Sequence, residues 1–471
     1  MTKDNLILLA DAYKYSHHKL YIPGTQYIYS YLESRGGKFD ETVVYGLQYF
    51  LKEYLEGPVF TKEKLDEAEQ TLKEVFGRTD VFDRTKFEYI IERYGGKLPV
   101  RVKAVPEGMS VPVRNVLMTI ENTDPECFWL TNFLETLLMQ VWYPCTVASL
   151  SREIKKIVTR YYNETASEQS FGGIEFVLND FGFRGASSVE SAGIGGSAHL
   201  VNFSGSDTIA GSVLAKKYYN AATAPGLSIP ATEHSICTLL GEPGELTIFK
   251  HILDTFPTGT IACVSDSYNI FRACEEYWGT ALKDQILQRN GTLVIRPDSG
   301  DPVQTLTRVF DILMKKFGFT INEKGYKVLP PQVRVIQGDG ISYSSIPEIF
   351  EALKLAGISA ENLVLGMGGA LLQRVNRDTQ EFALKCSYAV VNGVGVDVQK
   401  SPVELDRAGN LRTSFKKSKA GKLKLIQPQQ QFETVGIQEY PDATDIMETV
   451  FENGHITREY TFDEVRKNAS I

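Results

Sequence analysis

The stretch Thr292-Leu-Val-Ile-Arg-Pro-Asp298-Ser-Gly300 decides the fold that the sequence predicts. Its first residues form a short aliphatic run typical of a buried strand, and the run stops at polar and turn-forming residues. Helix-like patterns, for example at residues 302–317 and 344–355, follow most runs of this kind, so the chain contains a βα series. The other runs of the same form are Thr260-Ile-Ala-Cys-Val-Ser-Asp266, Val333-Arg-Val-Ile-Gln-Gly-Asp339-Gly340 and Asn362-Leu-Val-Leu-Gly-Met-Gly-Gly369.

Such a series predicts an α/β fold with an irregular parallel βα barrel, in which functional side chains gather at the carboxyl ends of the strands. An ordinary turn requires glycine or aspartate, but it does not require the oppositely charged Arg296 and Asp298 on either side of a proline. We therefore expect functional polar residues and glycines along one rim of the barrel. The expected rim residues are Asp266, Arg296, Asp298, Asp339, Gly366, Gly368 and Gly369.

The two ends of the chain show a different pattern. Residues 1 to about 145 mix strand-like segments with helix-like ones, among them residues 128–141, and strand-like alternation returns at 382–391. Neither end has a full set of elements. We therefore expect residues 1–145 and 376–471 to form one α+β domain, packed against a barrel of residues 146–375 that carries most of the active site.

Composition limits the classes of function. The chain has 471 residues, of which 43% are hydrophobic, and a net charge of −8, which provides no basic field for nucleic acid. An anionic ligand must then be held by local arginines and lysines. No run of 18 uncharged apolar residues and no signal-like stretch occurs, and the six cysteines form no CxxC pair. We expect a cytoplasmic protein, in a reducing compartment, that binds neither nucleic acid nor membrane.

A histidine motif precedes the βα series, at Ile229-Pro-Ala-Thr-Glu-His234-Ser. Histidine has an ordinary pKa near neutrality, so it can carry a proton or, as a nucleophile, a phosphoryl group. A lone histidine in a loop is more often exposed or hydrogen-bonded structure. The polar rim that follows favours the functional interpretation.

A glycine-rich stretch, Asp180-Phe-Gly-Phe-Arg184 to His199, is the second motif. Its glycines allow close approach of the backbone to a ligand, Arg184 can fork onto an anion, and Phe181 offers a flat face for a ring. The glycines at 193, 195 and 196 do not form a dinucleotide-binding fingerprint, so a helix start with small packing residues is the alternative. Further on, Asp207 could accept a hydrogen bond from an amide or cap the following helix.

Taken in order, these motifs resemble those of the nicotinamide phosphoribosyltransferases, a family of type II phosphoribosyltransferases. The resemblance spans nearly the whole chain, and so many motifs in one order would not be expected by chance. The matching segments are Leu8 to Lys14, Asp180 to Gly185, Gly193 to Phe203, Pro230 to Ser235, Arg296 to Gly300, Val335 to Gly340, Lys385 to Tyr388 and Phe462 to Asn468.

The resemblance implies that nicotinamide displaces pyrophosphate from phosphoribosyl pyrophosphate (PRPP) to give nicotinamide mononucleotide, as a step of NAD salvage. It also implies coupling to ATP hydrolysis through phosphorylation of His234, with Glu233 orienting the ring. Phe181 and Tyr13, the latter from the second subunit of a homodimer, would sandwich the pyridine. Asp207 would accept the amide, and Arg296 would fix the base and the phosphoribosyl group.

The same resemblance assigns the phosphates and the ribose. Asp298 and Asp339 would lie near the ribose hydroxyls, and Asp266 would support the site near Mg²⁺, which would be bound mainly through phosphates. The 5′-phosphate would be bound by Arg184, Gly338, Gly368 and Gly369. The pyrophosphate or the phosphates of ATP would be bound by Arg35, Arg377, Lys385 and Lys400.

Three alternatives stay open. A nicotinate phosphoribosyltransferase would bring a carboxylate to Asp207, where two anions repel each other. A quinolinate enzyme would need a denser basic cluster around the ring. A catalytically silent protein that binds nucleotide metabolites would not need His234. In one departure from the family, Ala262 and Ala383 occupy positions where relatives carry serine, so hydroxyl contacts to ligand phosphates are expected to be missing.

Overall fold

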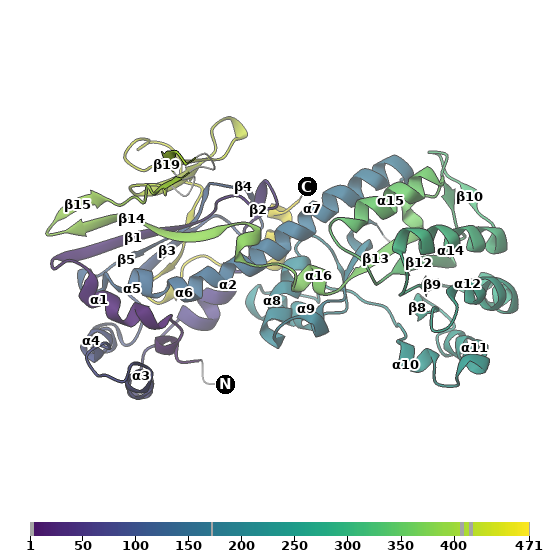
Figure 1. The fold of residues 1–471 in the computed structure, drawn as a ribbon, viewed down its shortest axis with the longest axis horizontal. Coiled ribbons are helices and arrows are strands. Elements are labelled where there is room, and N and C mark those ends of the chain that lie inside the picture. The colour runs from purple at the N-terminus through teal and green to yellow at the C-terminus, as the bar shows by residue number, and fades with distance from the viewer. Residues whose placement is uncertain (1–3, 171–172, 406–408, 414–417, 471) are drawn as a thin grey trace. The chain divides into compact units, whose positions relative to one another are not determined.

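The computed structural model describes residues 4–170, 173–405, 409–413 and 418–470. The chain divides into two compact units, with the first boundary inside the long helix α7 (Trp142–Thr165). Unit 1 contains residues 1–149, 217–220 and 376–470, and unit 2 contains residues 150–216 and 221–375. Elements are labelled in Figure 1.

Unit 1 is built on a seven-stranded sheet with strand order β15-β14-β1-β5-β3-β20-β21. All of its pairings are antiparallel. Strand β1 is long and mostly buried, and β14, which is equally long, is half buried; each has a neighbouring strand on both sides. The strand bounds are β1 Thr25–Ser34, β3 Val100–Ala104, β5 Val116–Asn122, β14 Phe382–Val391, β15 Val394–Asp397, β20 Glu448–Glu452 and β21 His455–Ile456.

The remaining elements of unit 1 are helices and pairs of short antiparallel strands. The segment expected as one helix at 128–141 is broken into α5, α6 and a 3₁₀ turn. The helices are α1 His17–Leu20, α2 Leu47–Phe50, α3 Lys62–Phe76, α4 Arg84–Tyr94, α5 Leu130–Phe133, α6 Glu135–Leu138 and α17 Phe462–Asn468; the paired strands are β2 Glu41–Val43 with β4 Ser110–Pro112, β16 Val403–Leu405 with β17 Leu411–Thr413, and β18 Leu423–Ile426 with β19 Glu433–Gly436.

Unit 2 contains a six-stranded parallel sheet with strand order β7-β6-β13-β12-β9-β8. Strands β8 and β9 are short, mainly aliphatic runs without polar alternation, as is usual for parallel strands covered on both faces, and β12 is buried along its whole length although it contains Arg334 and Gln337. The predicted α/β fold with a parallel βα series is confirmed. The strand bounds are β6 Leu178–Asp180, β7 Gly205–Ser206, β8 Ile261–Val264, β9 Leu293–Arg296, β12 Val333–Gln337 and β13 Leu363–Met367.

An extended segment at residues 227–231 joins the two edges of this sheet. Leu227 forms a parallel bridge with Gly205, the first residue of β7, and Ala231 forms one with Ala262 in β8. The six strands and this segment therefore curl into a barrel. The sequence of the segment has no alternating pattern, so its role was not predicted.

The helices of unit 2 begin and end where the sequence signals them. In α14 (Pro302–Phe317), the Asp301 side chain accepts a hydrogen bond from Gln304 N at 2.9 Å, and Gly318 ends the helix with a φ of 80°. The other helices are α8 Val189–His199, α9 Ile209–Tyr218, α10 His234–Cys237, α11 Glu245–Thr255, α12 Ile270–Arg272, α13 Lys283–Leu287, α15 Ser345–Leu355 and α16 Gly369–Leu372, with a hairpin of β10 Thr320–Ile321 and β11 Lys327–Val328.

The glycine-rich stretch at 193–196 lies inside α8 and serves packing. A Cβ atom on Gly211 would lie 2.6 Å from the backbone of Gly196, so α8 and α9 approach each other through glycines. The residues of α8 from Ala192 onward are buried. This is the packing alternative rather than a dinucleotide-binding turn.

Candidate active site

The barrel mouth in unit 2 is formed by the last inward-facing residues of four strands. One layer deeper, Ala262, Val294 and Ile336 form an apolar cluster inside the barrel. Because side chains alternate along a strand, the residues two positions further on face the same interior. Two positions beyond Val294, Ile336 and the adjoining Val364, these residues are Arg296, Gly338 and Gly366, and the Phe181 ring packs against the same cluster.

The two glycines of this layer leave space that the two large side chains fill. A Cβ atom on Gly366 would lie 2.0 Å from the Phe181 ring, and one on Gly338 would lie 2.9 Å from the Arg296 guanidinium. The guanidinium carbon lies 5.2 Å from the centre of the Phe181 ring, within the range of cation–π attraction. The layer therefore presents a flat aromatic face beside a fixed cation.

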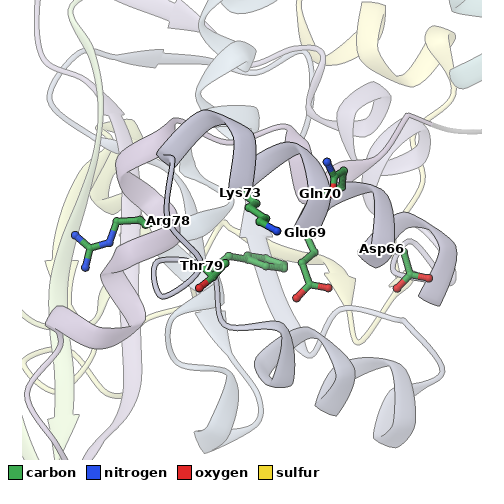
Figure 2. A pocket seen from close by; sticks show the side chains of 7 residues that line it. Asp66, Glu69, Gln70, Lys73, Arg78 and Thr79 are labelled. Carbon is green, nitrogen blue, oxygen red and sulfur yellow. The ribbon is translucent and has the colours of Figure 1, made fainter.

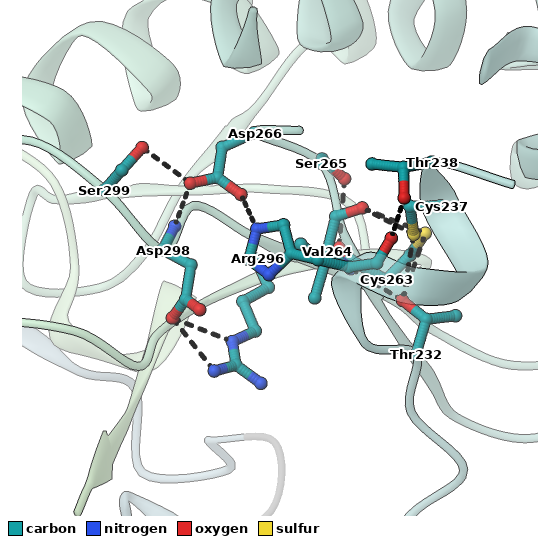
Figure 3. Close-up of polar contacts among 11 residues, drawn as sticks. Thr232, Cys237, Thr238, Cys263, Val264, Ser265, Asp266, Arg296, Asp298 and Ser299 are labelled. Atoms are coloured by element: carbon teal, nitrogen blue, oxygen red, sulfur yellow. Dashed lines mark hydrogen bonds and ion pairs between the residues drawn. The ribbon is translucent and has the colours of Figure 1, made fainter. Parts of the chain in front are cut away.

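Asp266 connects the next residues of the mouth (Figure 3). Its Oδ2 accepts hydrogen bonds from the backbone N–H of Asp298 at 3.1 Å and from the Ser299 hydroxyl at 2.6 Å. Asp298 in turn accepts from the Nε and Nη2 atoms of Arg296 at 3.1 and 2.9 Å. A chain of hydrogen bonds thus fixes the loop after β9, and both charges of the Arg296–Asp298 pair are compensated within the mouth.

His234 belongs to the same network. Its Nε2 lies 3.0 Å from Oδ1 of Asp266, whose side chain is only 4% exposed, whereas the imidazole is 49% exposed. Glu233 accepts a hydrogen bond from Ser235 instead. The expectation that Glu233 orients the ring is therefore corrected, because Asp266 holds the imidazole and Glu233 is turned to its other neighbour.

A cavity of about 200 Å³ extends from the mouth into the barrel. Phe181, Arg296 and Asp207 line it together with Ser228, whose hydroxyl donates to the Asp207 carboxylate. Sequence reasoning missed Ser228 because it lies in the closing segment, 21 residues from Asp207. Ala262 also lines this cavity. It belongs to the apolar cluster and does not lie beside a charged side chain of the mouth.

A buried carboxyl lies directly behind Phe181. Asp180 is fully buried, and its Oδ1 accepts from the backbone N–H of Gly182 at 2.7 Å. Burial raises the pKa of Asp180 to about 6, and the nearby charge of Asp207 adds to the rise, while the hydrogen bond from Gly182 opposes it. Asp180 thus stabilises the turn that carries the aromatic ring.

The turn that follows Phe181 places a cation, Arg184, beside exposed backbone. Arg184 is exposed, in a 3₁₀ turn, and a Cβ atom on the adjoining Gly185 would lie 3.4 Å from Cα of Gly369. A Cβ atom on Gly369 would meet no atom within 4 Å, so this backbone borders open space. Asp339 follows Gly338 at the end of β12, with an exposed side chain. Gly368 precedes α16, whose N-terminus lies at this turn.

The other expected site residues lie in unit 1. Arg35 follows β1, Arg377 lies in a 3₁₀ turn, Lys385 lies on β14 and Lys400 follows β15; we call these four residues the cationic face. Burial lowers the pKa of Lys385, the charges of Arg35, Lys400 and Arg377 lower it further, and only Glu135 opposes them. The four cations are therefore close enough to repel one another.

Tyr13 lies elsewhere in unit 1, in a 3₁₀ turn, and 57% of it is exposed. A hollow of about 280 Å³ on α3 of the same unit has a different character. Figure 2 shows its charged and polar lining, to which none of the expected site residues contributes. The Arg78 side chain there already pairs with Asp80. The barrel mouth is accordingly the better candidate for an active site.

Two family models match the chain. The model described as the nicotinate phosphoribosyltransferase family matches residues 176–454. The model described as the N-terminal domain of nicotinamide phosphoribosyltransferase matches residues 5–102.

Curated relatives match along almost the whole length. A nicotinamide phosphoribosyltransferase of Xanthomonas campestris pv. campestris is 46% identical over 474 residues, covering 99% of this chain and 98% of the relative. One of Acinetobacter baylyi is 32% identical over 496 residues, covering 97% and 95%.

Solved structures share the fold at low sequence identity. A nicotinate-nucleotide pyrophosphorylase from Pyrococcus furiosus has a TM-score of 0.59 at 13% identity, covering 100% of this chain and 96% of that one. Human nicotinic acid phosphoribosyltransferase has a TM-score of 0.57 at 17% identity, covering 98% and 93%. Nearest in sequence among these proteins is the Xanthomonas relative.

Proposed function

This chain belongs to the nicotinate phosphoribosyltransferase family and, within it, to the nicotinamide phosphoribosyltransferases, and we propose how its residues make nicotinamide mononucleotide. The reaction is a pentosyl transfer of NAD salvage. The pyridine nitrogen of nicotinamide attacks C1 of the ribose of PRPP, a C–N bond forms, and the C–O bond to pyrophosphate breaks.

The main support for this proposal is the flat face of the Phe181 ring beside Arg296 at the barrel mouth. The pyridine ring lies on Phe181, the amide N–H₂ donates to Asp207, and Arg296 fixes the ring from the side of the ribose. Because the C–O bond breaks ahead of attack, positive charge develops on the ribose, and the carboxylates of Asp298 and Asp339 stabilise it. Fixing the ring and the ribose in this way removes translational and rotational entropy before the reaction.

The phosphates are held by cations and exposed backbone. Arg184 and the glycines 338, 368 and 369 bind the 5′-phosphate, and the cationic face binds pyrophosphate or the phosphates of ATP. The described residues include no group of three or more His, Cys, Asp or Glu that could hold a metal ion. Mg²⁺ would be held mainly through the substrate phosphates, with Asp266 supporting the site, and it would neutralise the charge of the leaving pyrophosphate.

ATP acts through His234. The Asp266 carboxylate can only accept, so Nε2 of His234 carries the proton and Nδ1 keeps its lone pair. Nδ1 attacks the γ-phosphorus of ATP, a P–N bond forms, the P–O bond breaks and ADP leaves. The phosphoryl group adds roughly 1.5 to 2 negative charges beside the mouth. This charge draws the cations of the site toward a conformation that binds PRPP more tightly.

The protein works as a cytoplasmic homodimer in which Tyr13 of the second subunit covers the pyridine ring. Tyr13 is suited to this role because its ring is exposed in the single chain. In the part of the chain that the structure describes, no helix has the length and apolar character needed to cross a bilayer.

Replacement of the histidine tests the proposal. His234→Ala should remove ATP stimulation and acid-labile protein phosphate while a slow, ATP-independent formation of nicotinamide mononucleotide remains, because the mouth that binds PRPP is intact. His251→Ala, at an exposed position of α11, is the matched control and should keep full stimulation. Retained ATP stimulation in His234→Ala would exclude the phosphohistidine, and absence of any product from the wild-type protein would favour a silent binding protein.

Asp207→Asn tests the choice of amide over carboxylate. The asparagine can donate to a nicotinate carboxylate, so the ratio of kcat/KM for nicotinate to that for nicotinamide should rise, by about tenfold or more for one repulsion of a few kcal/mol. Steady-state rates with both substrates measure the ratio. An unchanged ratio would show that Asp207 does not contact the substituent of the ring.

A further inference from the structure

Two buried cysteines meet directly behind His234 (Figure 3). Cys237 is the last residue of the short helix α10 that begins with His234, and Cys263 lies in β8, upstream of Asp266. Both residues are 0% exposed. The two cysteines therefore belong to the two segments whose side chains form the His234–Asp266 hydrogen bond.

The two sulfur atoms share the same two polar neighbours. Sγ of Cys237 lies 3.2 Å from the carbonyl oxygen of Val264, and Sγ of Cys263 lies 3.5 Å from the same oxygen. The Thr232 hydroxyl lies 3.3 Å from Sγ of Cys237 and 3.8 Å from Sγ of Cys263. Two thiols held against one carbonyl and one hydroxyl are positioned to react with each other.

We propose that Cys237 and Cys263 form a reversible disulfide that switches His234 between an active and an inactive position. The effect on ATP coupling rests on the proposed function of His234, whereas the bond itself does not. The oxidant is a peroxide. The thiolate of Cys237 attacks a peroxide oxygen, giving a sulfenic acid and water after protonation. Cys263 sulfur then attacks this sulfur, an S–S bond forms and a second water leaves. The two thiols lose two electrons, which the peroxide gains.

The environments of the two thiols suit these unequal roles. Hydrogen bonds from Cys263 and Thr232 and the charge of His234 lower the pKa of Cys237 to about 7, although burial opposes them. Burial raises the pKa of Cys263 well above its ordinary range. Burial also raises the pKa values of Cys127 and Cys145 to about 12. Since the thiolate is the reactive form, Cys237 should be oxidised before these cysteines.

The bond would move the histidine because α10 is small and held by few contacts. A disulfide brings sulfur atoms to about 2.05 Å, closer than any contact between separate thiols. Of the four residues of α10, only Cys237 is buried, so this helix rather than the barrel strand should move. The same local opening of α10 would admit peroxide to the buried thiols.

The test uses the full chain, first reduced and then treated with hydrogen peroxide. Peptide mass spectrometry should find one cross-linked pair that joins the segments containing Cys237 and Cys263. The titration of the His234 imidazole, followed by NMR, should shift on oxidation. ATP stimulation should be lost and should return with dithiothreitol.

Variants separate the switch from general oxidative damage. Cys263→Val, which keeps an apolar side chain in the strand, should retain ATP stimulation after peroxide, and Cys237→Ala serves if that variant does not fold. Cys274→Ala, at a buried cysteine of the same unit, is the control and should lose stimulation as the wild type does. A reduced wild type without ATP stimulation would refute the function of His234 but not the bond. No cross-linked pair, or a cross-linked pair with an unchanged His234 titration, would overturn the proposal.

Discussion

The barrel mouth of unit 2 and the cationic face of unit 1 each contain one ionisable side chain whose charge is disfavoured, and the two signs are opposite. At the mouth, burial and the charge of Asp207 raise the pKa of Asp180 to about 6. On the cationic face, burial and the neighbouring cations lower the pKa of Lys385. Burial is the largest cause in both places, and an excess of like charge around the buried group adds to it.

The regions differ in how they treat that excess. The mouth compensates its charges internally, since Asp266 bonds His234 and Asp298 bonds Arg296. On the cationic face, Glu135 is already paired with Lys14, and Arg377 pairs with the exposed Asp378. This difference is consistent with the proposed binding of a neutral ring at the mouth and of an anion at the cationic face.

Removal of Arg296, whose charge compensates that of Asp298 at the mouth, should have the largest effect. Arg296→Ala removes the cation beside Phe181 and leaves Asp298 without its partner. Loss of one such preorganised charge costs about 3–4 kcal/mol in the transition state, so kcat/KM for nicotinamide should fall by roughly 10²- to 10³-fold. Steady-state kinetics measure the loss.

The matched control is Arg308→Ala, at an exposed arginine of α14 whose guanidinium also lies over a ring, that of Phe271, at 4.1 Å. Its kcat/KM should stay within about twofold of wild type, as expected for a surface substitution. Equal losses in both variants would mean that the Arg296–Asp298 pair acts only on folding.

The local parts of this arrangement could be predicted from the sequence. The helix α14 has the predicted bounds because its cap, its first proline and its final glycine are adjacent in the chain. The strand β14 also has the predicted bounds, Phe382–Val391, because strand-like alternation runs through the whole segment. The residues at the mouth follow from strand ends, since parallel strands bring their carboxyl ends together.

The partners of those residues could not be predicted, because they are set by tertiary contacts. The sequence favoured Glu233 as the partner of His234, yet the partner is Asp266, 32 residues away. The two cysteines lie 26 residues apart, and nothing in either local pattern indicates that they meet. The breaks in the helix expected at 128–141 likewise have no Gly or Pro signal between Leu130 and Val141.

The pH dependence of the unfolding free energy tests the protonation of Asp180 at the mouth. The pKa of Asp180 rises from an ordinary value of 3.8 to about 6 in the folded protein, so the folded state binds more protons than the unfolded state between these values. The unfolding free energy therefore falls as pH rises through this window, by about 3 kcal/mol at 1.36 kcal/mol per pKa unit. Asp180→Asn keeps the acceptor for Gly182 and lacks the charge.

Urea unfolding of both proteins at about pH 4 and about pH 7.5 measures this effect. The variant should gain up to about 3 kcal/mol relative to wild type between the two conditions. Asp284→Asn, at an exposed position of α13, should gain no more than about 0.5 kcal/mol. A pH-independent difference for Asp180→Asn would mean that Asp180 is charged in the fold at both values.

The smallest effect should come from the cationic face, where stability and binding should change in opposite directions. Lys385→Met removes one of four cations that repel each other, so unit 1 should become more stable at neutral pH. This gain should vanish above the ordinary lysine pKa of 10.5, because the wild-type side chain is then neutral in both the folded and the unfolded state. The same change removes a charge-assisted hydrogen bond to phosphate, worth about 2 kcal/mol, so the KM for PRPP should rise roughly thirtyfold. Thermal unfolding and PRPP kinetics of one preparation measure both quantities, with the exposed Lys62→Met as the control. If the KM rises while stability falls, contacts of the Lys385 side chain stabilise the fold by more than the repulsion among the four cations destabilises it. The cationic face would then not depend on a bound anion to offset that repulsion.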